Sequence, residues 1–315
     1  MRERSTALTR RGFVAGIAAS GLWLASCGST RWFTRGSERG TLRLIFYTDV
    51  HARTEWETPL ALARATEAIN ARKPDLVLAG GDLITDGFQS SAATVAPRWD
   101  VYVKMHEGIE ADLYPAIGNH DLVAAIPEDG TPPAADPRAV FRERLGVERT
   151  FYAFDAAGYR FFVLDSVEVI GGKLKYRGWI GAEQLEWLRS ELSRLSRTTP
   201  IVVVLHIPLL TAFYAATEGP TFAARPNRVV VNSREVLSLF REHNLVLVLQ
   251  GHLHAKELIR WRDTTFITGG AICGKWWRGE WFGTREGFNV VTLSGDHVRW
   301  EYVEYGWTAR RPHKA

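Results

Sequence analysis

Short apolar runs alternate with helical patterns along most of this chain, beginning near residue 41. Five of the runs have the length and composition of strands that are buried on both faces: 42–47, 75–79, 113–117, 201–205 and 245–249. Between them, the pattern predicts helices from residue 58, at about 91–109, along 185–195 and at about 232–243. This alternation of strand and helix is typical of an α/β fold.

Residues that favour helix starts and turns mark three boundaries. Thr58, followed by Pro59, is the predicted N-cap of the first helix. Asn232 and Glu235 have the spacing of a capping box at the start of the last helix. The segment 155–158 has the composition of a hairpin turn and predicts two further antiparallel strands around it.

The last 60 residues are rich in strand patterns. They predict strands at 257–261, 265–268, 289–293 and 297–303. We expect both halves of the chain to share one core, in which two sheets pack face to face and helices cover them.

Polar residues directly follow each of the five buried runs. These motifs are Asp49-Val50-His51, Gly80-Gly81-Asp82, Gly118-Asn119-His120-Asp121, His206 and Gly251-His252-Leu253-His254. Because ligands gather beyond the carboxyl ends of strands in open α/β sheets, we expect one shared site. Carboxylate, amide and imidazole groups suit two adjacent divalent or trivalent metal ions, whereas a structural zinc site would favour cysteines. Paired metal ions promote attack of hydroxide on a phosphoester.

Two of the motifs carry ligands two residues apart, and this spacing leaves two arrangements open. In an extended segment, His252 and His254 point the same way, as do Asp49 and His51, so each pair reaches one ion cluster. A local turn would instead divide His252 and His254 between two metal ions. Taken alone, His206 is more often a hydrogen-bonded core histidine, so the prediction depends on the five motifs together.

The charge of the chain is concentrated at its start. The formal net charge is +4, and residues 1–26 carry three of these four charges. The pI of 9.1 therefore overstates the basicity of the remainder, which is close to neutral. A nearly neutral body gives no electrostatic case for nucleic-acid binding, so we expect no nucleic-acid partner.

Residues 1–26 have the features of a cleaved export signal. Thr9-Arg10-Arg11-Gly12-Phe13 resembles a twin-arginine motif, and Leu24-Ala25-Ser26-Cys27 resembles a bacterial lipobox. The resemblance implies lipidation of Cys27, followed by a flexible tether over 27–40 and a single domain over 41–315. We therefore predict an exported protein that faces the periplasm or cell exterior and meets the membrane only through its lipid anchor. The other cysteine, Cys273, lies in an apolar segment and is expected to be a small buried residue.

The ordered motifs resemble those of the calcineurin-like metallophosphoesterase superfamily, in particular its exported bacterial members. The resemblance covers about 41–255 well and reaches weakly into 269–277. It implies a four-layer α-β-β-α sandwich of two mixed sheets with a dinuclear centre of manganese, iron or zinc.

The resemblance also assigns roles to individual residues. It implies seven metal ligands: Asp49, His51 and His254 for the first ion, Asn119, His206 and His252 for the second, and Asp82 bridging the two. A bridging hydroxide would attack phosphorus, while His120 would act as the general acid that protonates the leaving alkoxide. Asp121 is expected to cap the turn that follows, and Asp86 to be an exposed loop residue.

One position departs from a branch of this superfamily. Purple acid phosphatases have a tyrosine three residues after the bridging aspartate, and here that residue is Thr85. We therefore expect no tyrosinate–iron colour.

Aromatic residues after the fifth motif are candidates for substrate contact. Trp276 and Trp277 follow a predicted strand end, with Trp281 close by. They either wall a substrate cleft or cover the core.

The leading prediction is an exported metallophosphoesterase that acts on a small phosphoester, either a monoester or a diester. The alternative is a non-catalytic lipoprotein that keeps the fold and its metals for binding. The presence of His120 together with every implied ligand favours the enzyme.

Overall fold

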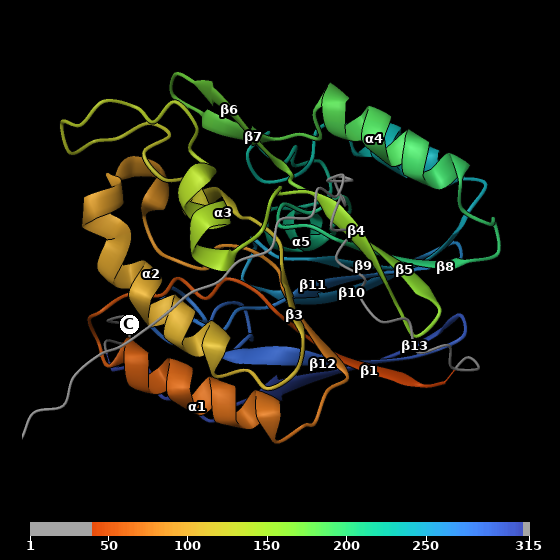
Figure 1. The fold of residues 1–315 in the computed structure, drawn as a ribbon, viewed down its shortest axis with the longest axis horizontal. Helices are drawn as coiled ribbons and strands as arrows, with labels where there is room; N and C mark the ends of the chain where they lie inside the picture. The colour runs from red at the N-terminus through yellow and green to blue at the C-terminus, as the bar shows by residue number, and fades with distance from the viewer. Residues whose placement is uncertain (1–39, 311–315) are drawn as a thin grey trace, which may run out of the picture. The chain divides into compact units, whose positions relative to one another are not determined.

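Two mixed β-sheets lie face to face, with helices on their outer surfaces (Figure 1). The structure is a computed structural model that describes residues 40–310. The predicted export signal over 1–26, the lipidation residue Cys27 and nearly all of the predicted tether over 27–40 lie outside the described residues. Within residues 40–310, no helix is both long enough and apolar enough to span a membrane.

The first sheet has five strands in the order β13-β12-β1-β2-β3. Their bounds are β1 Leu42–Tyr47, β2 Leu76–Ala79, β3 Leu113–Pro115, β12 Gly287–Ser294 and β13 His297–Glu304. The three N-terminal strands run parallel, and β12 returns from the end of the chain to pair antiparallel with β1.

The second sheet has six strands in the order β10-β11-β9-β8-β5-β4. Their bounds are β4 Tyr152–Ala156, β5 Tyr159–Val163, β8 Pro200–Val204, β9 Asn244–Gln250, β10 Lys256–Trp261 and β11 Thr264–Gly269. Ala157 and Gly158 both have positive φ between β4 and β5, which is the backbone of a two-residue hairpin turn. The hairpin prediction is therefore confirmed.

Helices flank the two sheets on opposite sides, with α1 and α2 on one side and α4 on the other (Figure 1). The helices are α1 Thr58–Asn70, α2 Ala92–Glu107, α3 Ala139–Leu145, α4 Ala182–Ser193, α5 Phe213–Thr217 and α6 Ser233–Leu239. Two short 3₁₀ turns, η1 Gly87–Gln89 and η2 Asn119–Asp121, lie in the loops after β2 and β3. A separate ribbon pairs β6 Val167–Gly171 with β7 Lys175–Gly178.

Alternate residues of each buried strand enter different layers of the core. On β1, Leu44 and Phe46 pack between the two sheets, whereas Ile45 and Tyr47 belong to the core cluster that includes the helix residues. Such two-sided burial explains why the strand sequences are continuously apolar. The predicted fold class, an α/β sandwich of two mixed sheets, is confirmed.

One predicted helix start is displaced by a residue, and a second is in the predicted place but lacks the expected capping hydrogen bond. Glu57, in the left-handed conformation, caps α1, so that Thr58 is already helical and its hydroxyl makes no capping bond. Asn232 is the N-cap of α6, but its side chain caps no backbone N–H of the helix: the amide exchanges two hydrogen bonds with the backbone of Ile180 and donates to the Glu235 carboxylate at 3.3 Å. At Asn232, a contact outside the helix replaces the expected capping bond.

Candidate metal centre

All five motifs meet where strands of both sheets end. Backbone hydrogen bonds continue the strand pairing into these loops: Asp49 donates to the Gly81 carbonyl at 3.0 Å, and His51 donates to the Asp82 carbonyl at 2.9 Å. On the second sheet, Gly251 donates to the His206 carbonyl at 2.8 Å. The polar side chains are thus fixed on the ends of rigid elements.

The first cluster of ligand atoms comes from the loops after β1 and β9. The Nε2 atoms of His51 and His254 lie 3.1 Å apart, and the Oδ1 atom of Asp49 lies 3.2 Å from the same nitrogen of His254. All three side chains are buried.

The second cluster comes from the loops after β8 and β9. His206 Nε2 lies 3.2 Å from His252 Nδ1 and 3.1 Å from Asp82 Oδ2. The structure therefore divides His252 and His254 between two clusters. The extended arrangement in which both point to one cluster is wrong, because each has a positive φ that turns the chain.

Asp82 lies between the two clusters. Its Oδ2 atom is 3.1 Å from His206 Nε2 and 3.6 Å from His51 Nε2, so one carboxylate oxygen faces both histidine pairs. Its Oδ1 atom accepts a hydrogen bond from the His120 backbone N–H at 2.7 Å.

Backbone carbonyls fix the direction in which three of the imidazoles present a lone pair. His206 Nδ1 contacts the Gly80 carbonyl at 2.9 Å, His254 Nδ1 contacts that of Gly274 at 2.6 Å, and His252 Nε2 contacts that of Asn227 at 2.9 Å. A carbonyl can only accept, so each of these nitrogens carries a proton, and in the neutral ring the other nitrogen faces the cluster with its lone pair. This is the usual way in which proteins orient metal-binding histidines.

Each cluster favours one added positive charge. Burial lowers the pKa of His51 and of His252 well below the usual value for imidazole. Burial also disfavours the charged forms of His254 and His206, the second histidine of each cluster. However, Cys273 and Asp49 together raise the pKa of His254 well above its usual value. The Asp82 carboxylate raises the pKa of His206 to about 9. One cation in each cluster can replace that proton.

Buried oxygens without hydrogen-bond partners also support the binding of a cation in each cluster. Among the described residues, Asp49 Oδ1 and Asn119 Oδ1 are buried and have no hydrogen-bond partner. Buried polar atoms are rarely left unpaired, because each costs about 1–3 kcal/mol. These oxygens, together with imidazole nitrogens that face one another at 3.1 and 3.2 Å, fit a pair of metal ions.

The backbone at these positions is strained. Five ligand candidates have positive φ, which is uncommon for residues other than glycine: Asp49, His51, Asp82, His252 and His254. Such strain costs about 1–3 kcal/mol per residue and clusters at functional sites.

His120 stands at the partly exposed edge of the centre. Its ring lies 4.6 Å from the ring of His51, edge to face, and its Nδ1 atom accepts the backbone N–H of Asp86 at 3.1 Å. In the neutral ring the proton is therefore on Nε2. Asp121 is buried and accepts hydrogen bonds from the backbone of Gly118, Leu83 and Ile84, so it joins the loops after β2 and β3 and closes the 3₁₀ turn.

The two tryptophans of the sequence prediction lie in different environments. The ring of Trp276 is 4.5 Å from that of His254 and is 36% exposed. Trp277 is buried, and its Nε1–H donates to the His51 carbonyl at 2.9 Å. Only Trp276 borders open space, whereas Trp277 supports the loop that carries His51.

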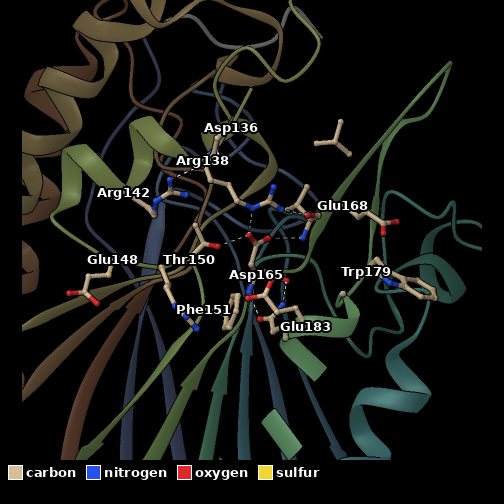
Figure 2. Close-up of a pocket in the computed structure, with 15 residues that line it drawn as sticks. Asp136, Arg138, Arg142, Glu148, Thr150, Phe151, Asp165, Glu168, Trp179 and Glu183 are labelled. Atoms are coloured by element: carbon tan, nitrogen blue, oxygen red, sulfur yellow. Dashed lines mark hydrogen bonds and ion pairs between the residues drawn. The ribbon is translucent and has the colours of Figure 1, made fainter. Parts of the chain in front are cut away.

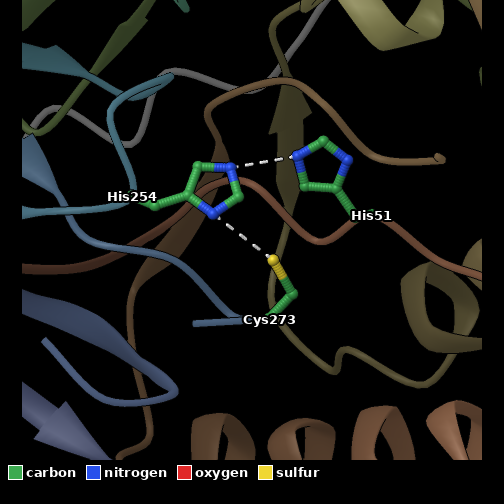
Figure 3. A group of neighbouring side chains, drawn as sticks. All are labelled: His51, His254 and Cys273. Carbon is green, nitrogen blue, oxygen red and sulfur yellow. Dashed lines mark hydrogen bonds between the residues drawn. The ribbon is translucent and has the colours of Figure 1, made fainter. Parts of the chain in front are cut away.

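Cys273 lies beside the first cluster, with its sulfur within 4.8 Å of ligand atoms of His51 and His254. Figure 3 shows its sulfur facing the ring nitrogen of His254 that does not contact His51, and the Sγ–Nδ1 distance is 3.6 Å. The thiol is fully buried, and burial raises its pKa. Its burial agrees with the sequence prediction, but its contact with His254 could not be read from an apolar context.

The sequence did not identify the partners that orient the histidines. These are carbonyl groups of Gly80, Asn227 and Gly274, and a carbonyl carries no side-chain signal.

A cavity lined by other residues lies away from this centre. It has a volume of about 570 Å³ and is bordered by α3, by the ribbon β6–β7 and by the start of α4 (Figure 2). Four of its charged groups are paired with one another: Arg138 binds Asp165 at 2.5 Å, and Arg142 binds Asp136 at 2.6 Å. None of the predicted site residues lines it.

Comparisons with known proteins agree with this geometry. The sequence profile described as calcineurin-like phosphoesterase matches residues 42–256. The chain is similar to purple acid phosphatase 15 of Arabidopsis thaliana, with 25% identity over 205 residues, which cover 58% of this chain and 36% of that protein. It is also similar to a probable cyclic nucleotide phosphodiesterase of a Synechococcus strain, with 27% identity over 243 residues, which cover 72% of this chain and 79% of that protein.

Among solved structures, a dimetal phosphatase from Danio rerio has a similar fold. The TM-score is 0.57 at 16% identity, and the match covers 84% of this chain and 99% of that one. The chain spans little more than a third of the plant relative's length.

Proposed function

The chain belongs to the calcineurin-like phosphoesterase family, and we propose that it hydrolyses phosphoester bonds with two metal ions. The observation that carries this proposal is the position of Asp82, whose Oδ2 atom lies 3.1 Å from His206 and 3.6 Å from His51. A single carboxylate oxygen that faces two histidine clusters is suited to bridging two metal ions.

The residues that would hold the ions follow from the clusters. Asp49, His51 and His254 would hold the first ion, Asn119, His206 and His252 the second, and Asp82 both. When bound, the ions would supply Lewis-acid chemistry, lowering the pKa of a nearby water and neutralising the phosphoryl oxygens. The chain's own contribution is to present unprotonated imidazole nitrogens in fixed directions and to bury the carboxylates that carry the balancing charge.

His120 would act as the general acid for the leaving group. Its Nδ1 atom accepts the N–H of Asp86, which places the ring proton on Nε2. A donor at the exposed edge of the site can protonate the leaving oxygen as the ester bond breaks.

The substrate class is a small phosphoester. The relatives with curated names include an acid phosphatase and a probable cyclic nucleotide phosphodiesterase, so monoesters and diesters are both reasonable probes. The nearly neutral body makes a nucleic-acid substrate unfavourable.

The test is hydrolysis of p-nitrophenyl phosphate and bis-p-nitrophenyl phosphate. Metal-stripped protein would be reloaded separately with manganese, zinc and iron, beside a His120→Ala control. We expect metal-dependent turnover that falls by about 10²-fold or more in the control. Absence of turnover with every metal, despite two bound ions per chain, would reject the proposal in favour of a non-catalytic binding protein.

We also propose export and lipidation at Cys27, on the strength of the sequence motifs alone. The full chain expressed in a bacterial host should partition into membranes, and a Cys27→Ser variant should appear in the soluble fraction. Equal partition of the two would reject lipidation.

A further inference from the structure

Arg53 extends from the loop that carries His51. Ala52 pairs with Ile84, which brings the following residues of the two loops together, and Arg53 Nη2 donates to the Thr85 hydroxyl at 3.2 Å. The Arg53 guanidinium also stacks on Trp56, with its carbon 4.1 Å from the ring centroid. The side chain is thus held in place from two sides.

Arg53 lies near His120, the proposed proton donor to the leaving group. Thr85, which accepts from Arg53, is followed directly by Asp86, whose N–H donates to His120. Arg53 and the proposed proton donor therefore contact adjacent residues of one loop.

Within residues 40–310, no carboxylate lies within ion-pair distance of Arg53. Asp86 approaches Arg98 instead, at 3.7 Å. The Nε atom of Arg53 is buried and lacks a hydrogen-bond partner among the described residues.

A second arginine approaches the same indole ring. The guanidinium carbon of Arg278 lies 5.5 Å from the centroid of the Trp56 ring, and Arg278 likewise forms no ion pair in the described part of the chain. Arg278 belongs to the same loop as Trp276, whose ring lies beside His254. Two cations without carboxylate partners therefore gather at one edge of the metal centre.

We propose that Arg53 and Arg278 form a subsite for an oxyanion, a carboxylate or a second phosphate, on the leaving group of the substrate. The guanidinium fork matches the paired oxygens of either anion, and an anion would satisfy the buried Nε donor and relieve the repulsion between the two cations. The inference rests on the proposed hydrolase function and narrows its substrates to phosphoesters whose alcohol part is itself anionic.

The experiment compares matched phosphomonoesters with the metal-loaded full chain. Serine O-phosphate and ethanolamine phosphate differ only in a carboxylate, and propane-1,3-diol bisphosphate and its monophosphate differ in a second phosphate. We expect kcat/KM to be about tenfold or more higher for the anionic member of at least one pair, as a charge-assisted hydrogen bond predicts. The pair that shows the preference identifies the anion.

Variants then assign the preference to these residues. Arg53→Ala should reduce the ratio of kcat/KM within the favoured pair about tenfold, Arg53→Lys should recover part of it, and Arg278→Ala should reduce it independently. The matched control is Arg262→Ala, which removes a similar stacked guanidinium, 4.8 Å from the centroid of Trp261, at the opposite end of β10 from His254. It should leave the ratio unchanged.

The outcomes separate this inference from the function on which it rests. Turnover of p-nitrophenyl phosphate with equal kcat/KM inside both pairs would overturn the anion subsite and leave the hydrolase proposal standing. A preference that survives in Arg53→Ala and Arg278→Ala would also overturn it. If the unmodified, metal-loaded protein turns over none of the substrates, p-nitrophenyl phosphate included, both the hydrolase proposal and the subsite are overturned.

Discussion

Gly118 offers a direct test of how the metal centre is assembled. It precedes Asn119 and lies against the loop that carries Asp82. A Cβ atom at Gly118 would come within 2.2 Å of the backbone nitrogen of Asp82 and 2.3 Å of its Oδ1 atom. Because φ at Gly118 is −107°, alanine meets no backbone penalty there, and the substitution Gly118→Ala perturbs only the contact between the two loops.

The size of the effect follows from what the added methyl would meet. Overpacking a tight site costs about 1–3 kcal/mol, and here the nearest atom is backbone, which yields less easily than a flexible side chain. We therefore expect a loss of about 2–3 kcal/mol. For a chain of this size, that loss lowers Tm by about 4–12 °C. Metal content should fall below that of the unmodified protein, because Asp82 Oδ2 faces both clusters.

The assay is thermal unfolding by calorimetry, together with metal content by elemental analysis. Gly181→Ala is the matched control, because no atom lies within 4 Å of the added Cβ and φ is −69°. As a change of helix cap it should cost less than about 1 kcal/mol and leave metal content unchanged. If Gly118→Ala unfolds at the same temperature as Gly181→Ala and retains its metal, the close approach of the two loops is refuted.

Four further predictions follow from the same geometry. His252→Ala and His254→Ala should each remove about one metal ion per chain in elemental analysis, and loss of both ions in either variant would contradict the division into two clusters. Chelation should lower the unfolding temperature, since a ligand at 100 times its Kd contributes about 2.7 kcal/mol, and an unchanged calorimetric transition would count against metal binding. Iron-loaded protein should lack a phenolate–iron absorption band, because Thr85 stands where a tyrosine would be required; a visible band would refute this. Trp277→Phe, which removes the donor to the His51 carbonyl, should cost about 1–3 kcal/mol in denaturant unfolding, and an unaltered midpoint would show that this hydrogen bond is unimportant.

The strands and the site motifs were predictable because both depend on burial. Runs such as 201–205 are apolar at every position, since each side chain enters one of two cores. A polar residue that ends such a run stands out for the same reason. By contrast, most residues of the ribbon β6–β7 are half-buried, and apolar and polar residues do not alternate clearly along it. Its sequence therefore did not predict these two strands.

Local capping signals predicted less than the hydrophobic pattern did. The amide of Asn232 has the chemistry of a helix cap, yet it pairs with the backbone of Ile180, a residue 52 positions away. A tertiary partner competes with the helix for the same donor and acceptor, and nothing within a few residues of Asn232 reveals which one wins. The spacing of His252 and His254 likewise left open whether they face one cluster or two, because it does not fix the backbone conformation; only the family resemblance assigned them to separate ions.

That backbone conformation links the fold to the chemistry. Glycine would adopt the left-handed angles of the loops after β1, β2 and β9 without strain, yet the sequence places Asp49, His51, Asp82, His252 and His254 there. Each of these residues therefore costs free energy for the sake of its side chain. The strain is tolerable only because hydrogen bonds between neighbouring loops, which extend the two sheets beyond their last strand residues, hold the turns in place. The buried sheets therefore bring the ligands to one edge and also stabilise the strained, charged loops of the centre. For this reason the motifs indicate a metal centre only when they stand at the ends of buried strands.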